Sequence, residues 1–156
     1  MSLQPLHAAY LGELYGIAFF TAFAQEYSDD THIYKWQLLI QVEQITAKRL
    51  KNYLDPRGIA CSTHDMAMEN KGRQDAQKWI DRDWPTLMDT LVPWVKPYAL
   101  RYRQDAAQAT DHHAMFDLVQ QHEDAIYAFL LAEQQATHSG TPHLEAFIAR
   151  YPEDEA

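Results

Sequence analysis

Three glutamates stand where apolar residues would otherwise continue a helical stripe, and carboxylates in such places can bind a metal ion. Glu13 interrupts the first stripe, Glu43 the second and Glu123 the fourth. Buried carboxylates that lie close together raise one another's pKa, so they require protons, hydrogen-bond donors or a cation. Oxygen donors suit a hard cation, and His122 or water could complete its coordination. One interpretation of the pattern is therefore a metal site formed by the three carboxylates, with His122 or water as a further ligand.

The alternative is a metal-free cluster in which donors from the chain itself satisfy the carboxylates. Under this interpretation no cofactor is bound and the glutamates have only a structural role. The hydroxyl, indole and guanidinium groups that could serve as donors belong to Tyr10, Thr46, Trp94, Tyr98 and Arg101.

Apolar residues at spacings of three and four predict long helices that would position these side chains, and no stretch alternates as a strand does. The fold class is therefore predicted to be all-α. The third helix contains three prolines and should be broken or kinked there. The expected helices are 5–27, 31–54, 73–107 and 112–137, with a short last helix over 142–150 and a frayed acidic tail.

The lengths of the connections predict the topology. Residues 28–30 form a short turn, which makes the first two helices antiparallel neighbours. Residues 55–71 form a long polar segment that can extend to about 55 Å, whereas a helix of 23 residues is about 35 Å long. The chain can therefore return along the bundle, so that the second and third helices run parallel.

Folding the chain about its turns predicts which residues lie at the same height. On the first two helices, Glu13 then lies opposite Thr46, and Glu43 lies opposite Gly16. The two carboxylates are therefore expected within one helical turn of each other. The third carboxylate, on the fourth helix, is expected near the centre of the bundle, at the height of Val95.

Three segments resemble the ferritin-like superfamily, especially its rubrerythrin-like members: GELYGIAFF, LIQVEQITAKRL and QQHEDAIYAFLLAEQ. The resemblance covers about residues 5–137 and implies a four-helix bundle with a long crossover between its second and third helices. Members with a di-iron or di-manganese centre use one Glu from each of two helices and a Glu-x-x-His pair from each of the others. By resemblance, Glu13 matches the lone Glu of the first helix and Glu43 matches the first Glu-x-x-His.

The sequence departs from that ligand pattern in several places. Thr46 occupies the histidine position after Glu43, and Ile126 occupies the histidine position after Glu123. The third helix offers no carboxylate at the matching height. Three of six ligands remain, all of them oxygen donors, and they lack the imidazoles that favour iron. The resemblance therefore implies a degenerate site, bound to iron or manganese if to any metal.

The expected function is that of a ferritin-like bundle with a non-catalytic binding or structural role. The alternative is a carboxylate-bridged di-iron or di-manganese oxidase or oxygenase. Whether the chain is an enzyme stays open, since no catalytic residue or substrate is indicated. Two weaker alternatives are a hemerythrin-like site around His112, His113, Asp117 and His122, and a ligand pocket lined by aromatic residues of the third helix.

Composition excludes several classes of protein. The chain has 156 residues, which predicts one domain, and a single cysteine, which excludes an internal disulfide and a cysteine-based zinc site. Its net charge of −9 disfavours nucleic acid as a partner. The longest apolar run, residues 14–24, is too short to span a membrane. We therefore expect a cytoplasmic protein, with a homodimer through the third or fourth helix as a further expectation.

Overall fold

The all-α class is confirmed by the computed structural model, which describes residues 2–135 and 139–152 and contains no strand among them. The predicted end of the fourth helix at Thr137 and the acidic tail from 153 onward lie outside these described residues. The helices are α1 (Gln4–Glu26), α2 (Ile33–Leu54), α3 (Met66–Gln77), α4 (Trp84–Gln108), α5 (His113–Gln135) and α6 (Thr141–Arg150), with short 3-10 turns at Asp30–His32 and Asp55–Arg57.

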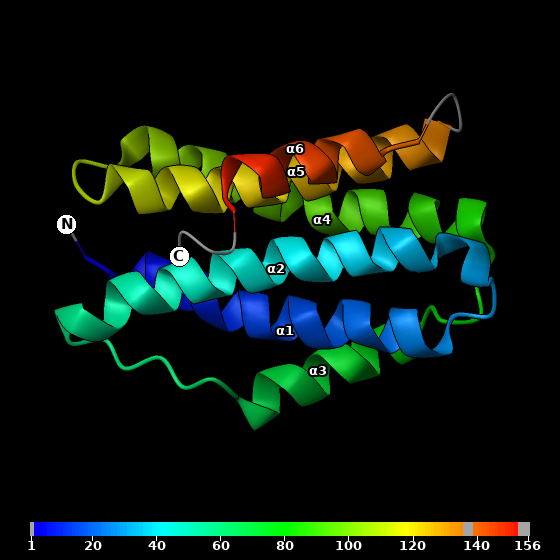
Figure 1. The fold of residues 1–156 in the computed structure, drawn as a ribbon, viewed down its shortest axis with the longest axis horizontal. Coiled ribbons are helices and arrows are strands. Elements are labelled where there is room, and N and C mark those ends of the chain that lie inside the picture. Colours follow the sequence, from blue (N-terminus) through cyan, green and yellow to red (C-terminus); the bar gives the residue numbers. More distant parts are fainter. Residues whose placement is uncertain (1, 136–138, 153–156) are drawn as a thin grey trace.

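Four long helices, α1, α2, α4 and α5, lie side by side along the longest axis of the molecule (Figure 1). The colours show that α1 and α5 run in one direction, whereas α2 and α4 run in the other. The short α3 packs against α1, and α6 packs against α5 and α2. The connection between α2 and α4 returns along the bundle, and α3 forms part of it.

The predicted third helix, residues 73–107, is in fact two helices. Helix α3 begins at Met66, inside the segment predicted as a loop, because the Asp65 side chain accepts a hydrogen bond from the Met68 N–H and caps the helix. Residues 78–83 then separate α3 from α4. The prediction overlooked the N-cap and placed the break at the prolines instead of at residues 78–83.

Helix α4 starts where its sequence places an N-cap and a proline together. The Asp83 side chain accepts a hydrogen bond from the Thr86 N–H, and Pro85 lies in the first turn, where a missing N–H costs nothing. Pro93 and Pro97 lie inside α4 at exposed positions, and the helix continues through both. The break predicted from the three prolines therefore lies before the first of them.

The apolar core consists of two clusters with a polar layer between them. One cluster includes the stacked rings of Phe23 and Trp36, whose centroids are 4.7 Å apart. The other includes Leu6, Leu50 and Phe116. On α1, α2 and α5, buried polar residues occupy the positions where the chain passes from one cluster to the other.

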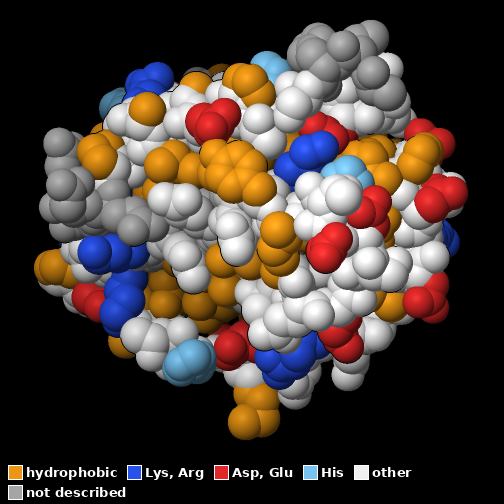
Figure 2. All heavy atoms as spheres, turned by 45° about the vertical axis from the view of Figure 1, so that its right-hand side comes forward, with side chains coloured by type: hydrophobic (Ala, Val, Ile, Leu, Met, Phe, Trp, Pro, Cys, Tyr) orange, Lys and Arg blue, Asp and Glu red, His pale blue; other side chains and the backbone are white. Residues whose placement is uncertain are grey.

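The surface mixes charged and apolar side chains. On the face drawn in Figure 2, Lys and Arg are interspersed with Asp and Glu around hydrophobic side chains. Large exposed apolar side chains include Met66 on α3 and Leu100 on α4. No described helix is long and apolar enough to cross a membrane. The homodimer, the cytoplasmic location and the exclusion of nucleic acid remain predictions.

Candidate metal centre

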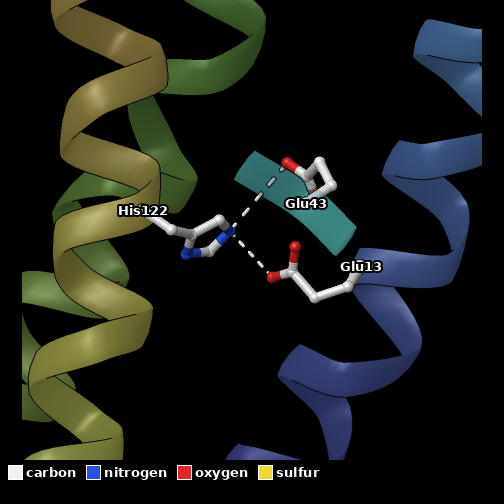
Figure 3. Close-up of side chains that lie close together, drawn as sticks. All are labelled: Glu13, Glu43 and His122. Atoms are coloured by element: carbon white, nitrogen blue, oxygen red, sulfur yellow. Dashed lines mark ion pairs between the residues drawn. The ribbon is translucent and has the colours of Figure 1, made fainter. Parts of the chain in front are cut away.

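Side chains from three helices meet in the polar layer. Glu13 comes from α1, Glu43 from α2 and His122 from α5, and they point toward one another (Figure 3). One ligand atom from each lies within 4.8 Å of the other two. His122 Nε2 is 2.7 Å from Glu13 Oε1 and 4.0 Å from Glu43 Oε1. All three residues are buried, with 1 to 5% of their surface exposed.

The register predicted for the first two helices is confirmed at Gly16. A Cβ atom on this glycine would lie 2.6 Å from Glu43 Oε2, so the carboxylate packs directly on the α1 backbone. Any larger residue would push Glu43 away from its present position.

Two of the predicted donors to the carboxylates are used elsewhere. Thr46 is buried, but its hydroxyl donates to the Val42 carbonyl one turn back in α2, at 2.9 Å. The Tyr10 hydroxyl donates to the Ser62 carbonyl at 2.6 Å. Within the polar layer, the group that faces the carboxylates is the imidazole of His122.

His122 is held in one orientation by its own helix. Its Nδ1 forms a short hydrogen bond with the Val119 carbonyl. A carbonyl only accepts hydrogen bonds, so Nδ1 carries the proton and Nε2 faces the carboxylates. A backbone carbonyl behind the ring is a common way to orient a metal-binding histidine. Nε2 must therefore either carry a second proton or direct its lone pair at a cation.

Glu123 lies at the edge of the group and not at its centre. Its Oε2 is 3.2 Å from His122 Nε2, and its side chain is 12% exposed. The sequence predicted Glu123 as the midpoint of the buried stripe on this helix, with His122 as an additional ligand. In the structure His122 points into the group and Glu123 lies at its edge. His122 follows Val119 by three residues and Glu123 precedes Ile126 by three residues, so helical spacing alone fits either residue to the buried stripe.

The group holds protons tightly in the absence of a metal. Burial raises the pKa of Glu43 well above its usual range, and the charge of Glu13 and a hydrogen bond to it raise it further. Burial opposes the charged form of His122, but the Glu13 charge and hydrogen bonds to Glu123 and Glu13 outweigh it, so the pKa of His122 is also raised. Glu13 Oε2 is buried and accepts no hydrogen bond from the described residues. Both shifts favour the protonated forms of Glu43 and His122 when no metal is bound.

A cavity of about 300 Å³ adjoins these residues. Glu13, Glu43, His122 and Glu123 all line it, and residues of α3 and α4 complete its walls. The sequence pointed to aromatic residues of the third helix as candidates for a ligand pocket. Three of them line the cavity, namely Trp94, Tyr98 and Tyr102. The fourth, Trp84, lies elsewhere and stacks on His32.

The hemerythrin-like arrangement is absent from the described residues. His112 Nδ1 pairs with the Tyr53 hydroxyl, and the Asp117 carboxylate accepts from Gln121 Nε2 at 2.6 Å. Within the described part of the chain, the only group of three potential ligands that comes together is Glu13, Glu43 and His122.

Comparison with known proteins yields no relative. No family model matches the chain, and neither a curated protein nor a solved structure matches it. The function must therefore be inferred from the residues of the site.

Proposed function

We propose that this protein binds one divalent metal ion between Glu13, Glu43 and His122, in a ferritin-like bundle whose crossover contains α3. The observation that carries this proposal is the convergence of three ligand atoms from three helices within 4.8 Å, in a buried site where no described Lys or Arg forms an ion pair with the carboxylates. A divalent ion would satisfy Glu13 Oε2, a buried oxygen that accepts no hydrogen bond in the described part of the chain.

The donor set favours particular metals and a particular role. Two carboxylates and one imidazole suit Mn²⁺, Fe²⁺ or Zn²⁺ better than a soft ion. Three protein ligands leave a coordination position open, as in catalytic and ligand-binding metal sites, whereas structural sites are closed. The open position would face the adjoining cavity, with Glu123 close enough to act as a further ligand. The proposed role is therefore to hold a metal that a small molecule can reach.

The di-iron or di-manganese alternative requires more ligands than the site offers. A second ion would need carboxylates from α4, where the side chain beside His122 is that of Tyr102, with ring centroids 5.9 Å apart. Glu123 is the one additional carboxylate beside His122. A single ion is consequently the better-supported occupancy, and it is compatible with a binding role.

Titration of metal-free protein with Mn²⁺, Fe²⁺ and Zn²⁺ under anaerobic conditions tests this proposal. We expect one ion per chain, and at least about tenfold weaker binding in Glu13→Gln and in His122→Gln, equivalent to about 1.4 kcal/mol. Glu133→Gln is the matched control, because it removes a buried carboxylate outside the site. Absence of stoichiometric binding, or equal affinity in all three variants, would refute the proposal. Two ions per chain would favour the di-metal alternative.

A further inference from the structure

The size of the cavity limits what can bind beside the metal centre. Its volume of about 300 Å³ is at the lower end of ligand-binding pockets, which range from about 300 to 1,000 Å³. A dinucleotide or a haem would need more space. The cavity therefore fits a compact molecule about the size of one aromatic ring with a short side chain.

The walls of the cavity combine aromatic rings with small residues. Trp94 of α4 stacks on Phe19 of α1, with ring centroids 4.7 Å apart and planes inclined at 28°. Nearer the start of α1, the small residues Ala8 and Gly12 also line the cavity. The nearest atom to a Cβ on Gly12 would be the Tyr102 hydroxyl oxygen at 3.8 Å. Such walls favour a flat apolar body that can stack on an aromatic ring.

The charged side chains at the opening differ in how they are paired. Asp75 accepts hydrogen bonds from the Tyr15 hydroxyl at 2.6 Å and from Lys78 Nζ at 2.9 Å, so its charge is already neutralised. Lys71 and Arg101 are exposed residues that line the cavity. Neither has an ion-pair partner within 4.0 Å in the described part of the chain, whereas Lys71 lies 5.8 Å from the Tyr15 ring.

These charges give the opening a net positive character. Asp105 is the remaining carboxylate at this end of the cavity, and it offsets one of the two cations. An incoming anion could therefore pair with Lys71 and Arg101 without displacing an existing ion pair. Arginine in particular matches a carboxylate through two parallel hydrogen bonds. The interior, in contrast, is acidic and is the place for a cation.

We infer that the cavity binds a small aromatic monocarboxylate, with its carboxylate at Lys71 and Arg101 and its ring against Trp94. The far end of such a ligand would reach the polar layer at Glu13 and His122. That the ligand meets a metal there rests on the proposed function, whereas its binding at the opening does not.

Three probes with the same body and different charge test this inference: phenylpropionate, phenylpropanol and phenylpropylamine. Calorimetric titration is carried out on metal-free protein and on protein loaded with Zn²⁺. We expect the carboxylate to bind to both forms, at least about tenfold more tightly than the alcohol. Equal binding of acid and alcohol, tighter binding of the amine, or no binding of the acid at millimolar concentration would overturn the inference.

Substitutions at the opening locate the carboxylate. The double variant Lys71→Gln/Arg101→Gln should lose at least about tenfold in affinity for phenylpropionate while keeping its affinity for the alcohol. Lys96→Gln, an exposed lysine of α4 that does not line the cavity, is the matched control and should bind as the wild type does. If binding requires Zn²⁺ and is unchanged in the double variant, the carboxylate sits on the metal and the assignment to the opening is wrong.

A second variant tests the cavity itself. Gly12→Leu would place a side chain in the space beside Tyr102 and should abolish binding of both the acid and the alcohol. Retained binding of the acid in a folded Gly12→Leu protein would contradict the inference. If this variant does not fold, the probe series and the variants at the opening still decide the question. Binding of the acid without any metal binding would refute only the proposed function.

Discussion

Two clusters in this protein contain buried carboxylates, and they differ in how the negative charge is compensated. Near the end of α5, Glu133 accepts hydrogen bonds from Lys35 Nζ at 2.6 Å, from the Gly140 N–H at 2.7 Å and from Trp84 Nε1 at 3.1 Å. Every partner is a donor, and one of them is a cation. A buried charge with such partners is fully compensated by the protein.

The polar layer in the middle of the bundle lacks this compensation. Glu13 and Glu43 face each other, and one imidazole is shared among them and Glu123. The nearest lysine and arginine lining the adjoining cavity are exposed residues at its opening. The first cluster therefore joins helices, whereas the second leaves a place for a cation that comes from outside.

The largest expected difference between the clusters is in stability. Glu133→Ala should lower the free energy of unfolding of the metal-free protein by about 3 kcal/mol, because it leaves Lys35 and two buried donors without their acceptor. This corresponds to a decrease in Tm of about 6 to 12 °C for a chain of this length. Thermal and urea unfolding measure both values.

Glu43→Gln is the corresponding test in the polar layer, and it removes the acid while keeping the size of the side chain. It should leave the Tm of metal-free protein unchanged or raise it, since it removes a buried acid that must otherwise hold a proton. A loss as large as that of Glu133→Ala would show that Glu43 is structurally compensated, and the contrast between the clusters would not hold.

A metal should stabilise only the second cluster. At a free concentration about one hundred times Kd, a bound ion adds about 2.7 kcal/mol to the free energy of unfolding, which is about 5 to 10 °C in Tm. We expect this shift in the wild type and, from a lower starting Tm, in Glu133→Gln. Differential scanning fluorimetry with Zn²⁺ or Mn²⁺ measures it. An equal shift in His122→Gln would place the ion elsewhere.

The two clusters should also respond to pH in opposite ways. Burial and the neighbouring Glu13 raise the pKa of Glu43, and the pKa of His122 is raised despite burial. The folded state thus keeps protons that the unfolded state has lost. Metal-free protein should therefore become less stable as pH rises above the ordinary pKa of each group, 4.5 for Glu43 and 6.5 for His122, by up to about 1.4 kcal/mol per pH unit for one such proton. Urea unfolding at several pH values measures this slope.

Glu133 provides the contrast in the same measurement. Burial opposes its ionisation, but the Gly140 N–H and Lys35 lower its pKa below the usual range. Its contribution to stability is therefore present above pH 4.5 and lost as pH falls through the lowered pKa.

Two variants separate these pH dependences. Glu43→Gln should flatten the decline in stability with rising pH, and Glu133→Gln should leave that decline intact. Saturating Zn²⁺ should reverse the slope, because the deprotonated ligands bind metal better at higher pH. A wild-type slope that neither Zn²⁺ nor Glu43→Gln changes would contradict this account.

The sequence predicted the first two helices and their register well, because a three-residue turn fixes which positions face each other. Counting back from that turn along both helices places Glu43 against Gly16, where the folded chain has it. The start of α3 was missed and the break before α4 was expected at the prolines, because the signals for the two helix starts are the side-chain caps Asp65 and Asp83, which a search for apolar periodicity does not detect.

The site was predicted in its composition but not in its arrangement. Periodicity places His122 and Glu123 equally close to the buried stripe of α5, and only the packed helices show which one points inward. A histidine three residues after Val119 can bond back to its carbonyl, which was the one local signal available. The cluster around Glu133 was not predicted at all, since its partners come from α2, α4 and the start of α6, which only tertiary packing brings together.

The smallest expected effect comes from two glycines of α1. Gly12→Ala and Gly16→Ala make the same change in helix propensity, worth up to about 1 kcal/mol in favour of alanine. A Cβ on Gly12 has room, so that variant should gain stability and bind metal as the wild type does.

A Cβ on Gly16 would meet the Glu43 carboxylate at 2.6 Å. Because that carboxylate is the end of a flexible side chain, it can turn away at little cost to the fold, but the ligand position is lost. Gly16→Ala should therefore keep a Tm close to that of the wild type and bind Zn²⁺ about tenfold more weakly. Unchanged affinity in a folded Gly16→Ala protein would show that Glu43 does not ligate the metal from its present position, and the second cluster would then need a different pair of ligands.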